Sequence, residues 1–196
     1  MWRDLGFAVD ESGVCRVGSV GIQLAGAGDA PGIRSWALAV PAPLPSSIDG
    51  LATTVVEGGH AGASASAVHP NGTVALDHLV VTSHDQRRTE AALVATGFEP
   101  RRTLEMGDRR YTFFRTGDTI LELIGPAEPD DRRDRPARFY GLAFTVDDLD
   151  ATALSLGEHL GPVKDALQPG RRIATVRRDA GATVPIAFMS PGPGAI

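Results

Sequence analysis

The chain has 196 residues, a formal net charge of -5 at pH 7 and hydrophobic residues at 42% of its positions. This composition is typical of a soluble globular protein with one substantial domain or two small ones, and its acidic balance argues against nucleic-acid binding. The single cysteine excludes an internal disulfide bond, and no apolar stretch reaches the roughly 18 to 20 residues that span a bilayer. The start "MWRDLGFAVDE" has no long apolar stretch behind a basic head, so we expect a cytoplasmic protein with neither membrane nor nucleic-acid partners.

Residues 1–56 are predicted to form a degenerate, partial structural unit. "LGF" at 5–7 is typical of a helix end, "RVGSVGIQLAG" at 16–26 of a hairpin, and "IRSWALAV" at 33–40 of a strand. These strands are too apolar to stay exposed, so we expect the segment to pack against the rest of the chain and Trp36 to be substantially buried. Its free strand edges can pair with the rest of the chain or with a second copy, which makes a homodimer an expected assembly.

Two stretches are predicted to be connections. Residues 57–73 are rich in Gly, Ala and Ser, as in a linker or long loop, and would place His60 and His69 in a mobile segment. Residues 127–138 combine prolines with charges of both signs, which is typical of an exposed loop.

An internal repeat organises the remaining chain, 74–196. "LDHLVVTSHDQRRTEAALVATG" from Leu76 is echoed by "FYGLAFTVDDLDATALSLGEHLG" from Phe139. Each copy reads as a strand, a helix-capping signal (Ser83 with Gln86, Asp147 with Asp150) and a helix. Strand-like runs follow at about 100–105, 110–116 and 118–125, and at about 163–167, 171–178 and 183–189. The sequence therefore predicts two βαβββ repeats, repeat A at about 74–126 and repeat B at about 139–191.

Glu122 is an unusual residue in this pattern. It lies in the apolar run "TILELIGP", where strand alternation places it on the same face as Ile120 and Ile124. An isolated carboxylate among such neighbours is costly, so we expect a cation, a metal, a proton-sharing partner or a wet cavity beside it. The stretch "RVGSVGIQLAG" at 16–26 matches "RTGDTILELIG" at 115–125 in register and places Gln23 opposite Glu122. Gln23 cannot ionise and suits a structural role.

The paired repeats with "DHLVV", a "GF" helix end, "FFRTGDTILELIGP" and "GLAFTVDDLDA" resemble the vicinal oxygen chelate superfamily. This superfamily includes glyoxalase I, extradiol dioxygenases, and fosfomycin- and bleomycin-resistance proteins. The resemblance implies an α+β fold in which each βαβββ unit curls its mixed sheet into half of a bowl, with the ligand in the cup.

Metal-binding members place His or Gln at the opening strand of a unit and Glu at the closing strand. His78 and Glu122 match these positions in repeat A, whereas Gly141 and Ala187 match them in repeat B and offer no side-chain ligand. An open catalytic metal site normally has three protein ligands. The resemblance therefore leaves three roles for His78 and Glu122: an incomplete divalent-metal site, a metal-free catalytic acid–base pair, or a structural hydrogen-bonded pair.

Three further residues are candidates for contact with a ligand. Most aromatic residues near the strands are expected in the core, and Phe114 and Phe144 are the ones predicted to line the cup. Arg172, in "GRRIATVRR", would either bind a carboxylate or phosphate of the ligand or protect an edge strand with its charge.

Two functions follow from the resemblance. The first is a glyoxalase/bleomycin-resistance-like protein that binds a small organic molecule in an apolar cup, with or without metal-independent enzymatic activity. The second is a divalent-metal-dependent lyase, isomerase or dioxygenase of the same superfamily. The missing ligands at Gly141 and Ala187 favour the first, so we expect no cofactor or only a weakly held divalent metal.

Overall fold

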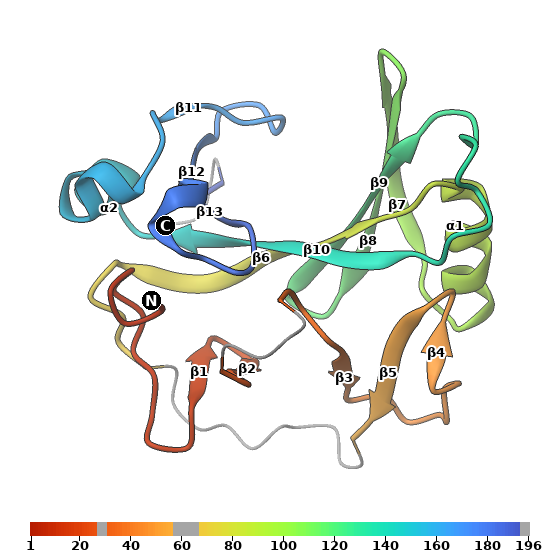
Figure 1. Cartoon of the computed structure of the whole chain (residues 1–196), viewed down its shortest axis with the longest axis horizontal. Coiled ribbons are helices and arrows are strands. Elements are labelled where there is room, and N and C mark those ends of the chain that lie inside the picture. The colour runs from red at the N-terminus through yellow and green to blue at the C-terminus, as the bar shows by residue number, and fades with distance from the viewer. Residues whose placement is uncertain (27–30, 57–66, 193–196) are drawn as a thin grey trace. The chain divides into compact units, whose positions relative to one another are not determined.

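A computed structural model describes residues 1–26, 31–56 and 67–192. It confirms the predicted α+β fold with two βαβββ repeats (Figure 1). Repeat A consists of β6 (Thr73–Thr82), α1 (Gln86–Ala95), β7 (Pro100–Met106), β8 (Arg109–Thr116) and β9 (Thr119–Pro126). Repeat B consists of β10 (Arg138–Val146), α2 (Leu149–Leu156), β11 (Lys164–Asp165), β12 (Arg172–Thr175) and β13 (Ile186–Met189).

The four strands expected of each repeat are neighbours in the order β6-β9-β8-β7 in repeat A and β10-β13-β12-β11 in repeat B. In each repeat the first strand pairs in parallel with the last strand, while the connecting hairpins are antiparallel. Val80 lies opposite Glu122 in repeat A, and Ala143 lies opposite Ala187 in repeat B. The sequence repeat is therefore also a repeat of strand register.

The chain forms two compact units, each built around one repeat. The repeat A unit comprises Gly32–Gly62 and His78–Gly141, and the repeat B unit comprises Met1–Pro31, Ala63–Asp77 and Leu142–Ile196. The predicted division at a 57–73 linker stays a prediction, because residues 57–66, with His60, lie outside the described residues. The predicted homodimer and cytoplasmic location also stay predictions.

Helix α1 covers one face of the repeat A strands. Its N-cap is Asp85, two residues after the predicted Ser83, and the Asp85 carboxylate accepts a hydrogen bond from the backbone N–H of Arg88. Leu93 of the helix is fully buried, and Trp36 stacks on Phe98 with ring centroids 5.5 Å apart. The buried core beneath the helix consists of Ile48, Leu51, Val81, Leu93, Phe114, Leu121, Leu123 and Ala137.

A small three-stranded sheet adds to this core from the N-terminal part of the chain. It consists of β3 (Trp36–Leu38), β5 (Leu51–Val55) and β4 (Ser47–Ile48), in that order. Asp49 and Gly50 connect β4 to β5 with φ angles of 48° and 94°, the positive values that tight hairpin turns require. The Asp49 carboxylate accepts hydrogen bonds from Nε and Nη2 of Arg88, at 2.9 and 3.2 Å. Arg88 thus fastens the hairpin to α1.

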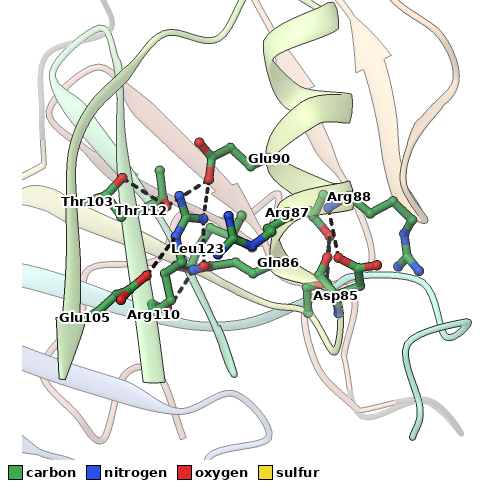
Figure 2. A network of polar contacts seen from close by, with 12 residues as sticks. Asp85, Gln86, Arg87, Arg88, Glu90, Thr103, Glu105, Arg110, Thr112 and Leu123 are labelled. Atoms are coloured by element: carbon green, nitrogen blue, oxygen red, sulfur yellow. Dashed lines mark hydrogen bonds and ion pairs between the residues drawn. The ribbon is translucent and has the colours of Figure 1, made fainter. Parts of the chain in front are cut away.

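A second polar network joins α1 to β8 (Figure 2). Arg110 donates to the Glu90 carboxylate and, at 3.0 Å, to the Gln86 side-chain carbonyl. Gln86 in turn donates to the backbone carbonyls of Arg110 and Leu123, both at 2.7 Å. The Arg110 and Glu90 side chains are only 12% and 21% exposed, so this ion pair is largely withdrawn from water. The network fixes the position of the helix on the sheet.

The N-terminal residues supply the corresponding cover in the repeat B unit. Phe7 packs against Phe144 and Phe188, with ring centroids 4.8 and 5.7 Å away, and Trp2 lies 4.8 Å from Phe7. The predicted hairpin is formed by β1 (Val14–Val17) and β2 (Val20–Gln23). Gln23 has the structural role expected of it, since its amide donates to the backbone carbonyl of Ser12 at 3.1 Å.

His69 is buried, although it belongs to the predicted linker. Its Nδ1 accepts a hydrogen bond from the backbone N–H of Ala8, and its Nε2 donates to the carbonyl of Arg16, both at 3.0 Å. Because one ring nitrogen must accept, the neutral imidazole is the form that fits. Burial lowers the pKa of His69 below its ordinary value of 6.5, against an opposing effect of the Arg16 hydrogen bond.

This environment predicts a pH-dependent stability. The unfolded chain binds a proton at His69 more readily than the folded chain does, so its contribution is full above about pH 6.5 and is lost as the pH falls toward the lowered pKa. His69→Gln can keep one acceptor and one donor without titrating. We therefore expect the free energy of unfolding of the wild type to fall more steeply between neutral and mildly acidic pH than that of the variant. Parallel curves from urea titrations would contradict this role.

Neither helix of the described residues is long and apolar enough to cross a membrane.

Candidate functional site

Glu122 lies at the centre of a three-by-three array of side chains on one face of the sheet. The pairing of β6 with β9 and of β9 with β8 places Val80, Glu122 and Phe113 side by side. Paired residues point to the same face, and so do alternate residues along each strand. The Glu122 face consists of His78, Ile120 and Arg115; Val80, Glu122 and Phe113; and Thr82, Ile124 and Tyr111, in three consecutive rows.

This face is the one turned away from α1. The intervening residues of the same strands, including Val81, Leu121 and Phe114, belong to the core with Leu93 of the helix. Glu122, Ile120, Ile124 and Phe113 are each partly exposed, whereas the residues between them on β9 are buried. The Glu122 face therefore remains accessible while the other face is filled.

The residues that adjoin Glu122 in the strand register are apolar, and polar residues occupy the corners of the array. Val80 and Phe113 flank it across the strands, and Ile120 and Ile124 along its own strand. The corner positions hold an imidazole, a guanidinium, a hydroxyl and a phenol, from His78, Arg115, Thr82 and Tyr111. This arrangement surrounds one carboxylate with an apolar ring and an outer ring of possible hydrogen-bond partners.

His78 is the most buried member of the array, with 2% of its surface exposed. Its ring lies edge-on to Phe113, with centroids 6.2 Å apart and an interplanar angle of 71°. His78 and Glu122 are one row apart on adjacent strands, which corresponds to about 8 Å between Cα atoms from standard sheet spacings. The two side chains share a face as the alternation predicted, and a direct bond between them stays a prediction.

The equivalent face of repeat B is built from small residues. Ala143 and Ala187 occupy the positions of Val80 and Glu122, and Thr175 occupies that of Phe113. Gly141 precedes them at the position of His78. Among the residues that the structure describes, no group of three His, Cys, Asp or Glu side chains is placed to hold a metal ion. The described residues of these two faces therefore offer two candidate ligands, His78 and Glu122, fewer than the three protein ligands of an open catalytic metal site.

Phe114 and Phe144 lie in the two cores, on the other face of the sheet from Glu122 and Ala187. Both side chains are 0% exposed, Phe114 in the α1 core and Phe144 in the cluster with Phe7 and Phe188. Their register explains this, because Phe114 is opposite Leu121 and Phe144 is opposite Phe188. Phe113, which sequence analysis did not select, is the phenylalanine beside Glu122.

Arg172 lies near the start of α2 and not on the equivalent of the Glu122 face. Its Nη1 and Nη2 donate to the two carboxylate oxygens of Asp150, at 2.9 and 2.8 Å. This hydrogen bonding raises the pKa of Arg172 and lowers that of Asp150. The neighbouring Arg171 is far more buried and donates to Asp77 and, at 3.1 Å, to the Thr145 hydroxyl.

Comparisons with known proteins agree with this architecture. The family described as the Glyoxalase/Bleomycin resistance protein/Dioxygenase superfamily matches residues 77–175. Methylmalonyl-CoA epimerase from Mycobacterium tuberculosis is similar in structure, at TM-score 0.50 and 20% identity, over 62% of this chain and 91% of that chain. A variant of the Streptomyces coelicolor methylmalonyl-CoA epimerase, in complex with 2-nitronate-propionyl-CoA, is similar at TM-score 0.50 and 20% identity, over 63% of this chain and 97% of that chain.

A hypothetical protein from Bacillus halodurans is also similar, at TM-score 0.50 and 13% identity, over 62% of this chain and 96% of that chain. At these identities the structural likeness supports the fold alone. No curated protein sequence matches the chain significantly. The family match spans just over half of the chain and runs from β6 of repeat A to β12 of repeat B. The protein therefore belongs to the Glyoxalase/Bleomycin resistance protein/Dioxygenase superfamily.

Proposed function

We propose that the protein binds a small organic molecule against the Glu122 face, with Glu122 and His78 as its polar anchors and without a protein-held metal ion. The observation that carries this proposal is the position of Glu122. A carboxylate stands at the centre of a partly exposed array whose nearest members are Val80, Phe113, Ile120 and Ile124.

The array has the composition of a ligand-binding surface. Small-molecule sites are mainly apolar with a few placed polar groups, which is the division seen between the inner and outer neighbours of Glu122. A partly exposed carboxylate can accept charge-assisted hydrogen bonds from a ligand. It can also take up or release a proton, so the same geometry suits acid–base catalysis on a bound ligand.

Strand register supplies a matched control for locating the ligand. Val80, Ile120 and Ile124 have methyl groups on the Glu122 face, whereas Val81, Leu121 and Leu123 alternate with them on the core face. We expect members of a library of small organic acids, alcohols and amides to shift the first set in methyl NMR spectra and to leave the second set unchanged. A library in which no member shifts the methyl signals of Val80, Ile120 and Ile124 would refute the proposed site.

A prediction on metal content separates this proposal from the metal-dependent alternative. The positions of Gly141 and Ala187 offer no side-chain ligand, so purified protein should contain well under one equivalent of divalent metal per chain. Elemental analysis of protein prepared without chelators or a His-tag provides the measurement. A full equivalent of Zn, Fe, Mn or Ni that survives dialysis and is lost on Glu122→Gln substitution would favour the metal-dependent enzyme instead.

A further inference from the structure

A second candidate binding site lies in the repeat B unit, in a part of the chain outside the family match. It is a pocket of about 450 Å³ between the N-terminal residues, β1 and the residues around Pro70. Phe7, Val9, Val14 and Pro70 contribute apolar walls. The volume lies in the range of pockets that take small organic ligands. None of the lining residues belongs to the Glu122 face.

The charged groups of this pocket have a positive excess. Arg3, Arg16 and Asp10 line it, which gives two cations and one anion. Hydrogen bonds from the Ser12 hydroxyl and the Val14 N–H lower the pKa of Asp10, so its carboxylate is ionised at neutral pH. The pocket is thus locally cationic in a protein whose net charge is -5.

Asp10 leaves much of this positive charge uncompensated. Arg3 donates through Nη2 to the backbone carbonyls of Val9 and Asp10, at 2.9 and 3.3 Å, and these carbonyls are neutral acceptors. Arg16 approaches the Asp10 carboxylate only to 3.9 Å, through Nε. A guanidinium has five donors, so both side chains retain capacity to bind an anion.

The β1–β2 hairpin leaves room for the Arg16 guanidinium. Gly21 is the cross-strand partner of Arg16, and a Cβ built on Gly21 would lie 3.8 Å from Nη1 of the arginine. The guanidinium therefore packs over a residue without a side chain. A larger residue at 21 would restrict the positions open to the arginine head group.

We propose that this pocket binds a small organic anion, a monocarboxylate with a compact apolar body. Arg16 and Arg3 would hold the carboxylate, since the forked donors of arginine match its two oxygens. The apolar body would lie against Phe7, Val9 and Val14.

The proposal is tested with three probes of similar shape and different charge: benzoate, benzamide and benzylamine. We expect benzoate to cause saturable shifts of the backbone amide signals of Ala8, Val9 and Val14 in NMR titrations of the full chain. Benzamide should bind about 10-fold more weakly or worse, and the benzylammonium cation should not bind, because the charge-assisted hydrogen bonds are lost. Equal affinity for benzamide, or shifts outside the pocket, would overturn the assignment.

Substitution of the arginine gives an independent test. Arg16→Met should weaken benzoate binding by about 10-fold or more, whereas Arg101→Met on β7, where Arg101 pairs with the exposed Glu99, should leave it unchanged. Benzoate binding to Arg16→Met with wild-type affinity would contradict the proposal. Should the variant lose its folded spectrum, the probe series on the wild type decides. Because the Glu122 face shares no residue with the pocket, failure here leaves the proposed function standing, and the reverse also holds.

Discussion

Replacing Arg110 by methionine is expected to lower the free energy of unfolding by about 3 kcal/mol, the order found when one member of a buried ion pair is removed. The variant leaves the Glu90 carboxylate, 21% exposed, without the guanidinium of Arg110, and removes one hydrogen-bond partner of Gln86, the first residue of α1. The network drawn in Figure 2 shows both contacts reaching the same guanidinium. Urea unfolding of the wild type and the variant measures the difference.

Two further variants separate two contributions to the lost free energy of unfolding, the unpaired Glu90 carboxylate and the lost packing of the arginine side chain. Arg110→Met combined with Glu90→Met removes both ions and should recover much of the lost stability, because buried pairs are often replaceable by apolar residues. Arg101→Met, on the neighbouring strand, breaks a pair whose side chains are 64% and 74% exposed and should have little effect. A double variant no more stable than Arg110→Met alone would show that the packing of the arginine stem dominates.

Glu122→Gln is expected to preserve the fold and to weaken ligand binding at the Glu122 face by at least about 10-fold. The substitution keeps the shape of the side chain and removes its charge, and its neighbours Val80 and Phe113 need no new rotamers. Any turnover that depends on proton transfer at this carboxylate should be lost as well. The readouts are the methyl NMR titration with ligands found for the wild type, and urea unfolding as the control for stability.

Glu122→Leu gives the contrasting result for a structural role. If Glu122 only filled space between Ile120 and Ile124, leucine would be neutral or stabilising and ligand binding would persist. At a binding face, leucine should abolish binding at little cost in stability. Binding that survives both substitutions would exclude Glu122 as an anchor, whatever the stability of the variants.

The repeats were predictable because they combine two local signals, strand alternation and helix-capping residues, in two copies. The pairing of Val80 with Glu122 and of Ala143 with Ala187 confirms the alignment by which Ala187 was matched to Glu122. The helix N-caps were predicted less accurately. Asp85 caps α1, two residues after the predicted Ser83, and Asp148 caps α2, one residue after the predicted Asp147. Several side chains in each connection can accept hydrogen bonds from the first turn of the helix, so the sequence does not single out one of them.

The choice between Phe113 and Phe114 could have been made from the sequence. The turn at Gly117 and Asp118 is a two-residue hairpin loop, which sets Thr116 opposite Thr119 and therefore Phe113 opposite Glu122. Which of Arg171 and Arg172 lies on which face of the strand could not be predicted from the sequence. Strands β12 and β13 are joined by a long connection, residues 176–185, which does not fix their register. The carboxylate that binds Arg171 belongs to Asp77, which is distant in the sequence.

The aromatic residues near the N-terminus carry a consequence for fragments of this protein. Phe7 covers Phe144 and Phe188, and Trp36 covers Phe98, so both repeats depend on residues that precede the family match. Helices of 10 and 8 residues leave part of each sheet face to these rings. A recombinant fragment cut to residues 77–175 would present uncovered phenylalanines to water, and such patches favour aggregation over a folded monomer.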